Sequence, residues 1–226
     1  MSDEKRAFAR RLAAESIAAG EPTAWFETLY AAAEAGDAVV PWADLEPNPL
    51  LVRWAAEAGR AHGGAALVVG CGLGDDAEFL AGLGYRTVAF DVAPTAVAAA
   101  QRRFPGSAVE YVAADLLDPP AGWLGAFDLV FESYTVQVLQ GAARAAAIAN
   151  CGALVAPGGE LLVLARARED ADEPGAMPWP LTRTEMEAFA TGDFQVVQLE
   201  AVHDHEEPPV RRWTATLRRR VVESTA

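Results

Sequence analysis

Three glycines at alternate positions, Gly70, Gly72 and Gly74, follow the short apolar run 65–69. Glycine permits a tight turn and lets the backbone approach a ligand closely. The segment after this turn has a helical pattern, and the start of a helix offers free N–H groups. A second apolar run, 87–90, ends at Asp91, whose carboxylate can accept hydrogen bonds from both hydroxyls of a ribose. This order of strand, glycine turn, helix, strand and acid predicts one nucleoside-binding half of a doubly wound sheet.

The charges beside the glycine turn indicate which nucleoside is expected. A dinucleotide fingerprint needs Gly-x-Gly-x-x-Gly, and that register puts Asp75 where the third glycine belongs. Asp75 and Asp76 would repel a pyrophosphate, whereas they suit the positive end of the helix dipole. A cofactor that has no phosphate and carries a positive sulfonium fits these carboxylates better. The sequence therefore favours S-adenosylmethionine over NAD, and a nicotinamide dehydrogenase is kept as a rival.

Apolar strands and helices alternate along most of the chain. Strands are expected at 65–69, 87–90, 108–112, 127–131 and 160–165, and helices at 4–19, 24–34, 50–61, 94–104 and 141–153. Crossovers long enough for a helix predict a parallel sheet that is covered on both faces. Two further strands, 194–202 and 210–219, are close in sequence, which predicts an antiparallel pair. The expected fold is a Rossmann-like, doubly wound, seven-stranded sheet, mostly parallel with an antiparallel edge strand, in a domain that covers 23–226.

Composition narrows the classes of partner. The chain has 226 residues, 52% of them hydrophobic, which is ample for one large core, and its formal net charge of −14 disfavours a nucleic-acid partner. No run has the length of a membrane span, and the N-terminus lacks the apolar core of a signal peptide. We therefore expect a cytoplasmic protein, monomer or homodimer, that acts on a small molecule. Residues 1–22 are expected to form an N-terminal helix that either packs on the domain or closes over the cofactor.

The glycine turn, Asp91 and a third acid, Asp115, together resemble the class I S-adenosylmethionine-dependent methyltransferases. Longer stretches are similar to the thiopurine and thiol/halide branch of that family. They are Trp25 on its helix, Pro41-Trp42, Glu46-Pro47-Asn48-Pro49-Leu50, the segment 68–77, Asp91 to Val97, Phe127 to Glu132, 154–162, Pro178-Trp179-Pro180-Leu181-Thr182 and Arg212-Trp213. The chain departs from that branch at Leu29, where relatives often have a second tryptophan, and at Glu132, where relatives show an aspartate.

The resemblance implies a set of residues that contact the cofactor. Trp25 and Trp42 would line its methionine and methyl end, Asp91 would hold the ribose, and Asp115 with Leu116 would frame the adenine. The full set is Trp25, Trp42, Gly70, Cys71, Gly72, Gly74, Asp76, Asp91, Val92, Ala114, Asp115, Leu116 and Glu132.

The acceptor pocket is expected at Trp42, Ser133, Tyr134, Trp179 and His203. Glu132 and Tyr134 are the first candidates for a catalytic base and His203 and His205 are the others, although Glu132 is favoured as a ligand of the cofactor's ammonium group. His203 and His205 flank Asp204 in a segment that is interpreted as a hairpin turn rather than a metal site, and no metal is expected. Arg211 and Arg212 are expected to face solvent on an edge strand, where one of them can pair with an acidic substrate.

Methyl transfer to sulfur is the favoured reaction, because a thiol is partly ionised near neutral pH and needs little more than positioning. The alternative enzyme is an O- or N-methyltransferase of a phenolic or heterocyclic metabolite, which would want a general base. The alternative from another class is a non-catalytic, cofactor-binding regulatory module.

Overall fold

The computed structural model describes residues 3–57, 63–204 and 206–221. Within this part of the chain, seven strands form one sheet in the order β3-β2-β1-β4-β5-β7-β6. The strands are β1 (Ala65–Val69), β2 (Arg86–Asp91), β3 (Glu110–Ala113), β4 (Phe127–Ser133), β5 (Val155–Arg166), β6 (Phe194–His203) and β7 (Arg211–Arg219). Among the described strands, β7 alone runs opposite to the other six, so the predicted mixed sheet is confirmed, with β7 antiparallel to both β5 and the edge strand β6.

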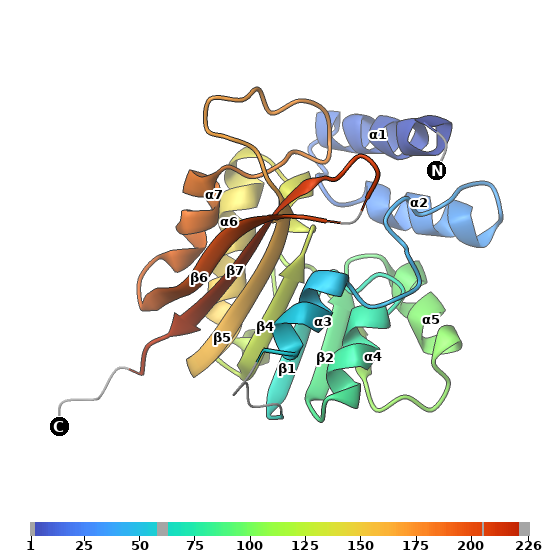
Figure 1. The fold of residues 1–226 in the computed structure, drawn as a ribbon. Coiled ribbons are helices and arrows are strands. Elements are labelled where there is room, and N and C mark those ends of the chain that lie inside the picture. The colour runs from blue at the N-terminus through green and yellow to red at the C-terminus, as the bar shows by residue number, and fades with distance from the viewer. Residues whose placement is uncertain (1–2, 58–62, 205, 222–226) are drawn as a thin grey trace.

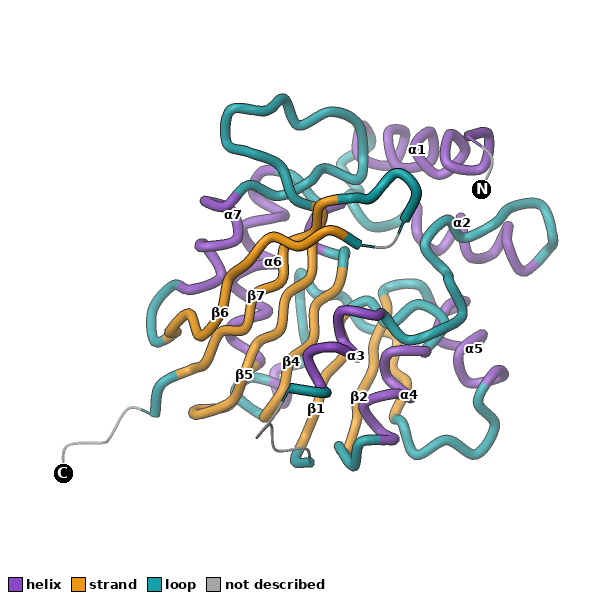
Figure 2. The backbone as a smooth tube through the Cα atoms, viewed as in Figure 1, coloured by secondary structure: helices purple, strands orange, loops and turns teal. Residues whose placement is uncertain are grey.

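The helices surround this sheet (Figures 1 and 2). The α-helices are α1 (Asp3–Ala18), α2 (Trp25–Glu34), α3 (Pro49–Ala55), α4 (Asp75–Gly82), α5 (Pro94–Arg103), α6 (Gly141–Leu154) and α7 (Arg183–Glu187). Three short 3-10 helices are η1 (Ala121–Trp123), η2 (Val136–Val138) and η3 (Ala188–Ala190). No helix in the described ranges is long and apolar enough to span a lipid bilayer.

Alternating side chains of the central strands build two separate cores. Leu67, Val130 and Val163 point to the face that α6, α7 and η3 cover, where Leu154, Met186 and Phe189 are buried. Val68, Phe131 and Leu162 point to the opposite face, where they pack with side chains of α3, α4 and α5. This burial on both faces explains why the parallel strands read as continuous apolar runs.

Strand register brings the functional segments to one edge of the sheet. Val69 of β1 pairs with Phe90 of β2 on one side and with Glu132 of β4 on the other. The glycine turn, Asp91 and the residues after β4 therefore emerge together at the carboxyl ends of the strands, where open α/β sheets bind their ligands. In Figure 1, α1 and α2 lie beyond this edge.

Two sequence expectations about local structure are wrong. The strand expected at 160–165 begins earlier, at Val155, because Gly158 at φ 84° accommodates a shift of register against β4 inside β5. The helix expected at 50–61 ends at Ala55 as α3, which begins with Pro49 behind a capping Asn48. Residues 58–62 lie outside the described part of the chain.

Candidate cofactor and substrate cavity

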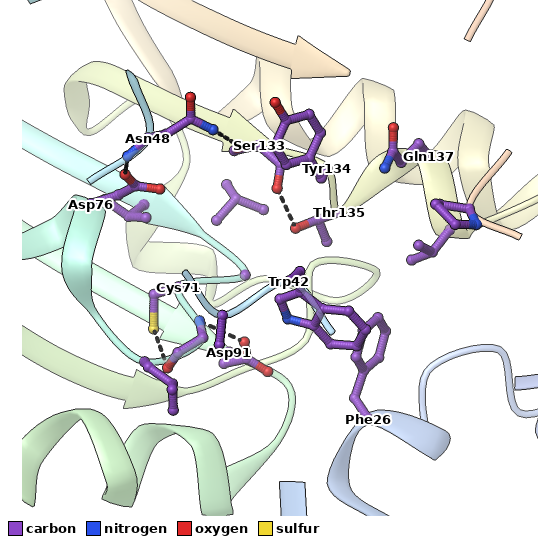
Figure 3. Close-up of a pocket in the computed structure, with 18 of the residues that line it drawn as sticks. Phe26, Trp42, Asn48, Cys71, Asp76, Asp91, Ser133, Tyr134, Thr135 and Gln137 are labelled. Carbon is purple, nitrogen blue, oxygen red and sulfur yellow. Dashed lines mark hydrogen bonds between the residues drawn. The ribbon is translucent and has the colours of Figure 1, made fainter. Parts of the chain in front are cut away.

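A cavity of about 840 Å³ opens at the carboxyl edge of the sheet. Its volume is near the upper end of the range for small-molecule sites, roughly 300–1,000 Å³. The wall is formed by the glycine turn, the ends of β2, β3, β4, β5 and β7, the helix α2 and the proline-rich segment 41–49. Figure 3 shows labelled side chains of this wall from α2, the segment 41–49, the glycine turn, the end of β2 and the end of β4 with the residues that follow it.

The glycine turn forms one wall of the cavity with backbone alone. Gly70 has φ 61° and Gly72 has φ 53°, a region that side-chain-bearing residues rarely adopt. A Cβ on Gly70 would overlap the Thr135 hydroxyl, and one on Gly72 would come within 3.0 Å of the Tyr30 hydroxyl. The turn is therefore closely enclosed, and its conformation and space both require glycine at these positions.

Asp91 joins the glycine turn to the end of β2. Its Oδ2 accepts the Gly72 N–H at 3.0 Å and its Oδ1 accepts the Ala93 N–H at 2.9 Å. The side chain lines the cavity although it is only 5% exposed. Burial raises the pKa of Asp91 to about 6, against the opposing effect of the Ala93 and Gly72 N–H groups. Each oxygen has a lone pair left, so the carboxylate can still accept hydrogen bonds from a ligand.

The two acids that follow the turn differ in their electrostatic state. Asp75 forms a bidentate ion pair with Arg103, at 2.7 and 2.8 Å, so its charge is neutralised. Asp76 lines the cavity and accepts the Asn48 N–H at 2.7 Å. Burial raises the pKa of Asp76 to about 6. The repulsion expected for a pyrophosphate therefore depends on Asp76 and Asp91 more than on Asp75.

Asp115 and Leu116, which are expected around an adenine, line the cavity at its β2–β3 end, together with the expected cofactor contacts Val92 and Ala114. Asp115 Oδ1 accepts the Leu117 N–H at 2.8 Å, which fixes the loop after β3.

The expected position of Trp25 in the cavity wall is wrong. Trp25 is 2% exposed and lies in a cluster between α1 and α2, where its Nε1 donates to the Pro22 carbonyl. Its stacked neighbour Phe26 lines the cavity instead. Helical periodicity alone does not distinguish which of two adjacent aromatic residues faces a ligand, so the sequence offered no signal for Phe26.

Trp42 does line the cavity, together with Tyr30 of α2. The indole Nε1 of Trp42 donates to Tyr30 Oη at 3.1 Å, and its ring meets the Phe26 ring edge-on at 6.0 Å. Figure 3 shows Trp42 and Phe26 side by side. These aromatic rings make an apolar wall opposite the end of β4.

Glu132 also does not line the cavity, contrary to its expected place at the reaction centre. Its side chain is 1% exposed, and Oε1 accepts the N–H groups of Thr135 at 2.8 Å and Val136 at 2.9 Å. Burial raises the pKa of Glu132 to about 7. The alternation of a strand explains the difference: Phe131 and Ser133 line the cavity, while Glu132 points to the other side.

The loop after Glu132 carries the polar groups of the cavity. Ser133 Oγ accepts a hydrogen bond from Asn48 Nδ2 at 3.4 Å. Tyr134 has φ 62°, an uncommon conformation for a residue with a bulky side chain. Burial raises the pKa of the Tyr134 phenol, although Arg212 opposes the shift. The phenol therefore stays protonated at neutral pH.

Arg212 is the main residue that sequence analysis misjudged. It is 8% exposed rather than solvent-facing, and it lines the cavity beneath the Tyr134 ring, 5.0 Å from the ring centroid. Asp204 binds its Nε at 2.6 Å and Glu206 binds its Nη2. The adjacent buried Trp213 marks an inner strand, but the sequence contains no signal for the side that Arg212 faces.

Most members of the predicted site are gathered around this cavity. Those that line it are Trp42, Gly70, Cys71, Gly72, Asp76, Asp91, Val92, Ala114, Asp115, Leu116, Ser133, Tyr134 and His203. Trp25, Gly74, Glu132 and Trp179 stand apart from it. Trp179 packs on the cluster of α1 and α2, and Gly74 contacts Tyr111 instead. His205 lies outside the described residues. Within them, no group of three or more potential metal ligands is found.

The sequence and the fold are both similar to those of known methyltransferases. Residues 66–159 match the model of a family described as a methyltransferase domain. The chain resembles the N-methyltransferase NodS of Bradyrhizobium japonicum WM9 in complex with S-adenosylhomocysteine, with 23% identity, a TM-score of 0.65, and coverage of 85% of this chain and 98% of that one. The fold is that of a methyltransferase.

Two further structures share this methyltransferase fold. One is the Burkholderia thailandensis 1,6-didemethyltoxoflavin-N1-methyltransferase with bound 1,6-didemethyltoxoflavin and S-adenosylhomocysteine, with 19% identity, a TM-score of 0.61, and coverage of 97% and 91% of the two chains. The other is a structure described under the conversion of a disulfide bond into a thioacetal group during echinomycin biosynthesis. It has 23% identity and a TM-score of 0.71, and the match covers 88% of this chain and 93% of that one. No curated protein gives a significant sequence match.

Proposed function

We propose that this chain binds S-adenosylmethionine in the cavity and transfers its methyl group to a small molecule. The observation that carries the proposal is the joined turn of Gly70, Gly72 and Asp91, which presents bare backbone and a buried carboxylate to one ligand. The family match over 66–159 supports the same cofactor, as do methyltransferase structures described with bound S-adenosylhomocysteine. Asp76 and Asp115 add negative charge to the wall, which suits a cationic cofactor and not a dinucleotide.

The residues of the chain bind and orient, while the cofactor supplies an electrophilic methyl group when bound. Asp91 accepts the ribose hydroxyls, and the loop after β3 holds the adenine. Trp42, Phe26 and Tyr134 exclude water and confine the acceptor near the methyl group. Methyl transfer is an in-line displacement, so confinement of the nucleophile can account for most of the rate acceleration.

Sulfur is the acceptor atom that the cavity supports best. A thiol has a pKa of about 8.5 and supplies a fraction of thiolate without a catalytic base. Of the first two candidate bases suggested by the sequence, Glu132 stands outside the cavity and Tyr134 stays protonated because burial raises its pKa. A phenol or amine acceptor would need His203, which lies at the exposed end of β6. The thiopurine and thiol/halide branch is proposed on the same grounds.

Calorimetric titration with S-adenosylmethionine, S-adenosylhomocysteine and NAD tests the cofactor. We expect the first two to bind and NAD not to bind. Mass spectrometry of reactions with matched thiols, phenols and amines then tests the acceptor, and methylation of the thiols is expected. Preferential methylation of a phenol or amine would establish the O- or N-methyltransferase, and binding without turnover of any acceptor would favour a regulatory module. NAD binding alone would reject the proposal.

The N-terminal segment 1–22 is proposed as a lid on the cavity. Ala9 and Arg10 of α1 line the cavity, and Arg10 Nε donates to the Met177 carbonyl at 2.9 Å. This bond ties α1 to the loop that follows β5. If α1 closes the site, Arg10→Ala will accelerate dissociation of S-adenosylhomocysteine in stopped-flow experiments, whereas an unchanged rate assigns α1 to packing alone. The cytoplasm and a monomeric or homodimeric state stay predictions from the sequence.

A further inference from the structure

The order of the strands separates the two ends of the cavity. Asp91 ends β2 and Arg212 is the second residue of β7, and β1, β4 and β5 lie between these strands. Four strand spacings of about 4.8 Å put β2 and β7 roughly 19 Å apart. A nucleoside held over β2 and β3 therefore leaves the β5–β7 end of the cavity for the acceptor. Arg212 lies at this acceptor end.

Arg212 is enclosed by negative and aromatic groups. Asp204 binds its Nε at 2.6 Å, Glu206 binds Nη2, and the ring of Tyr134 covers its face at 5.0 Å. The Arg212 side chain is 9% exposed. The guanidinium contributes one positive charge and the two carboxylates contribute two negative charges. The unit of Arg212, Asp204 and Glu206 therefore carries a net charge of about −1.

Asp204 is held in its charged form by the hairpin between β6 and β7. Its Oδ1 accepts the N–H groups of Val210 at 2.8 Å and of Glu206 at 3.1 Å. Burial alone would raise the pKa of Asp204, but the Val210 N–H and the Arg212 guanidinium outweigh it and lower the pKa. The negative charge of the unit is therefore a fixed property of the hairpin at neutral pH.

The other arginines that line the cavity do not reverse this balance. Arg53 pairs with Glu200 at 2.9 Å. Arg10 Nε donates to the neutral Met177 carbonyl, which leaves the positive charge of Arg10 in place. Arg166 lies opposite Arg212 in the register of β5 and β7 and also interacts with another residue of the chain. The carboxylates of Asp44 and Glu46 in the proline-rich segment offset the charges of Arg10 and Arg166 in the cavity wall.

We propose that the unit of Arg212, Asp204 and Glu206 sets the charge specificity of the acceptor end, which admits neutral and cationic acceptors and rejects anionic ones. The two carboxylates prevent Arg212 from serving as an anion-binding residue, and a carboxylate or phosphate on the acceptor meets net repulsion. This inference rests on the proposed methyl transfer and adds the chemical class of its substrate.

The test uses acceptors that differ only in charge. Benzene rings with a thiol at one position carry hydroxymethyl, aminomethyl or carboxymethyl at the para position, so that a methylene separates each substituent from the ring, and the same three substituents are placed on phenol and aniline. The hydroxymethyl and aminomethyl compounds are expected to have kcat/KM values at least about tenfold above the carboxylate compound. A carboxylate acceptor that is used as well as its neutral analogue overturns the inference.

A series of variants changes the charge of the unit in single steps. Arg212→Gln gives about −2, the natural chain −1, Glu206→Gln about 0, and Asp204→Asn with Glu206→Gln about +1. The ratio of kcat/KM for the carboxylate over the hydroxymethyl acceptor should rise along this series, by about tenfold or more between its two ends. A purely structural unit would lower the values for all acceptors together and leave the ratio constant.

The control is the double variant Glu34→Gln with Glu187→Gln. Both residues form exposed ion pairs, with Arg102 and Arg183, and neither lines the cavity. This variant changes the net charge of the protein as much as the double variant at the hairpin, but it should leave the acceptor ratio unchanged. If Asp204→Asn disturbs folding, Glu206→Gln alone still tests the trend, because Glu206 is 48% exposed.

Failure of this inference is distinguishable from failure of the proposed function. Binding of the three thiols to protein saturated with S-adenosylhomocysteine is measured by calorimetry alongside turnover. Weaker binding of the carboxylate thiol with no methylation of any acceptor would reject the function and keep the charge selection. Methylation with no preference by charge would keep the function and reject the inference. Equal binding of the three thiols would likewise reject the inference.

Discussion

Asp91 combines two tasks in one carboxylate. Its two oxygens hold the N–H groups of Gly72 and Ala93, and the same oxygens face the cavity. The side chain therefore shapes the glycine turn before any ligand arrives. Preorganisation of this kind lowers the cost of binding, because the ligand does not have to order the turn.

Replacement of Asp91 by alanine is predicted to weaken cofactor binding. Loss of charge-assisted hydrogen bonds costs roughly 1.5–3 kcal/mol, which raises the Kd by about tenfold or more. Calorimetry with S-adenosylhomocysteine measures this change. The matched control is Asp128→Ala, because Asp128 does not line the cavity and its Oδ2 accepts the Ala65 N–H at 2.8 Å. That variant should lose thermal stability and keep its Kd, and an unchanged Kd in Asp91→Ala would show that the ribose is bound elsewhere.

The raised pKa values of Asp76 and Asp91, both about 6, predict that cofactor binding depends on pH. A cationic ligand favours the ionised carboxylates, so protonation of either group below pH 6 opposes binding. The Kd for S-adenosylmethionine should therefore increase about tenfold between pH 7.5 and pH 5. Equal Kd values at the two pH values would contradict this.

The same two groups affect the unliganded protein in the opposite direction. Their pKa is raised from 3.8 in the unfolded chain, so their contribution to stability is present at low pH and is lost as the pH rises through about 6. The stabilisation provided by S-adenosylmethionine should accordingly be larger at pH 7.5 than at pH 5.

At the scale of elements, the loop between β4 and η2 depends on a carboxylate that never reaches the ligand. Glu132 Oε1 holds the N–H groups of Thr135 and Val136, and Thr135 in turn packs against Gly70. Glu132 Oε2 is buried without a hydrogen-bond partner among the described residues. We interpret Glu132 as a positioning residue that sets the loop bearing Ser133 and Tyr134.

Substitution of Glu132 separates the effect of its hydrogen bonds to the two N–H groups from the effect of its charge. Glu132→Ala leaves two buried N–H groups without an acceptor and should lower the free energy of unfolding by roughly 3–5 kcal/mol. Glu132→Gln keeps an oxygen for both groups and should stay within about 1 kcal/mol of the natural chain at pH 5. Urea denaturation measures both changes.

The difference between Glu132→Gln and the natural chain should depend on pH. The folded pKa of Glu132 is about 7, raised from 4.5, so the natural chain loses stability as the pH rises through 7. The glutamine variant does not titrate, and its relative stability should improve between pH 5 and pH 8. A difference that is constant over this range would show that Glu132 titrates normally.

The sequence was sufficient for most of the elements and for the position of the glycine turn and Asp91 at the carboxyl edge of the sheet. Apolar strands that end in Gly70 and Asp91 and long crossovers determine a parallel sheet, and a parallel sheet brings strand ends together. The direction in which single side chains point was harder to predict. Trp25, Glu132 and Arg212 have residue types suited to a site, but the side that each faces depends on helix rotation, strand phase and packing. The identity of a residue carries none of this information.

At the scale of the whole molecule, the net charge of −14 creates a field that attracts cations. Asp76, Asp91 and Asp115 extend that field into the cavity wall. A cationic cofactor would therefore be attracted at long range and then held by specific contacts. Its demethylated product lacks the sulfonium charge and experiences less of this attraction.

Salt is predicted to distinguish the two ligands. Stopped-flow association of S-adenosylmethionine should slow severalfold between about 0.01 and 0.5 M ionic strength, because the Debye length falls from roughly 30 Å to a few ångströms. Association of S-adenosylhomocysteine should change much less. Equal salt dependence of the two rates would argue against long-range attraction of the cofactor.

The position of β7 has a consequence for synthesis of the chain on the ribosome. β7 is the last strand in sequence, yet it lies between β5 and β6 in the sheet. Until Arg211–Arg219 has emerged, β5 presents an open edge and β6 has no strand to pair with. The buried residues of β5 include a run of apolar side chains, Leu161 to Ala165, so a chain without β7 exposes an aggregation-prone edge. Completion of the sheet must therefore wait until Arg211–Arg219 has left the ribosome.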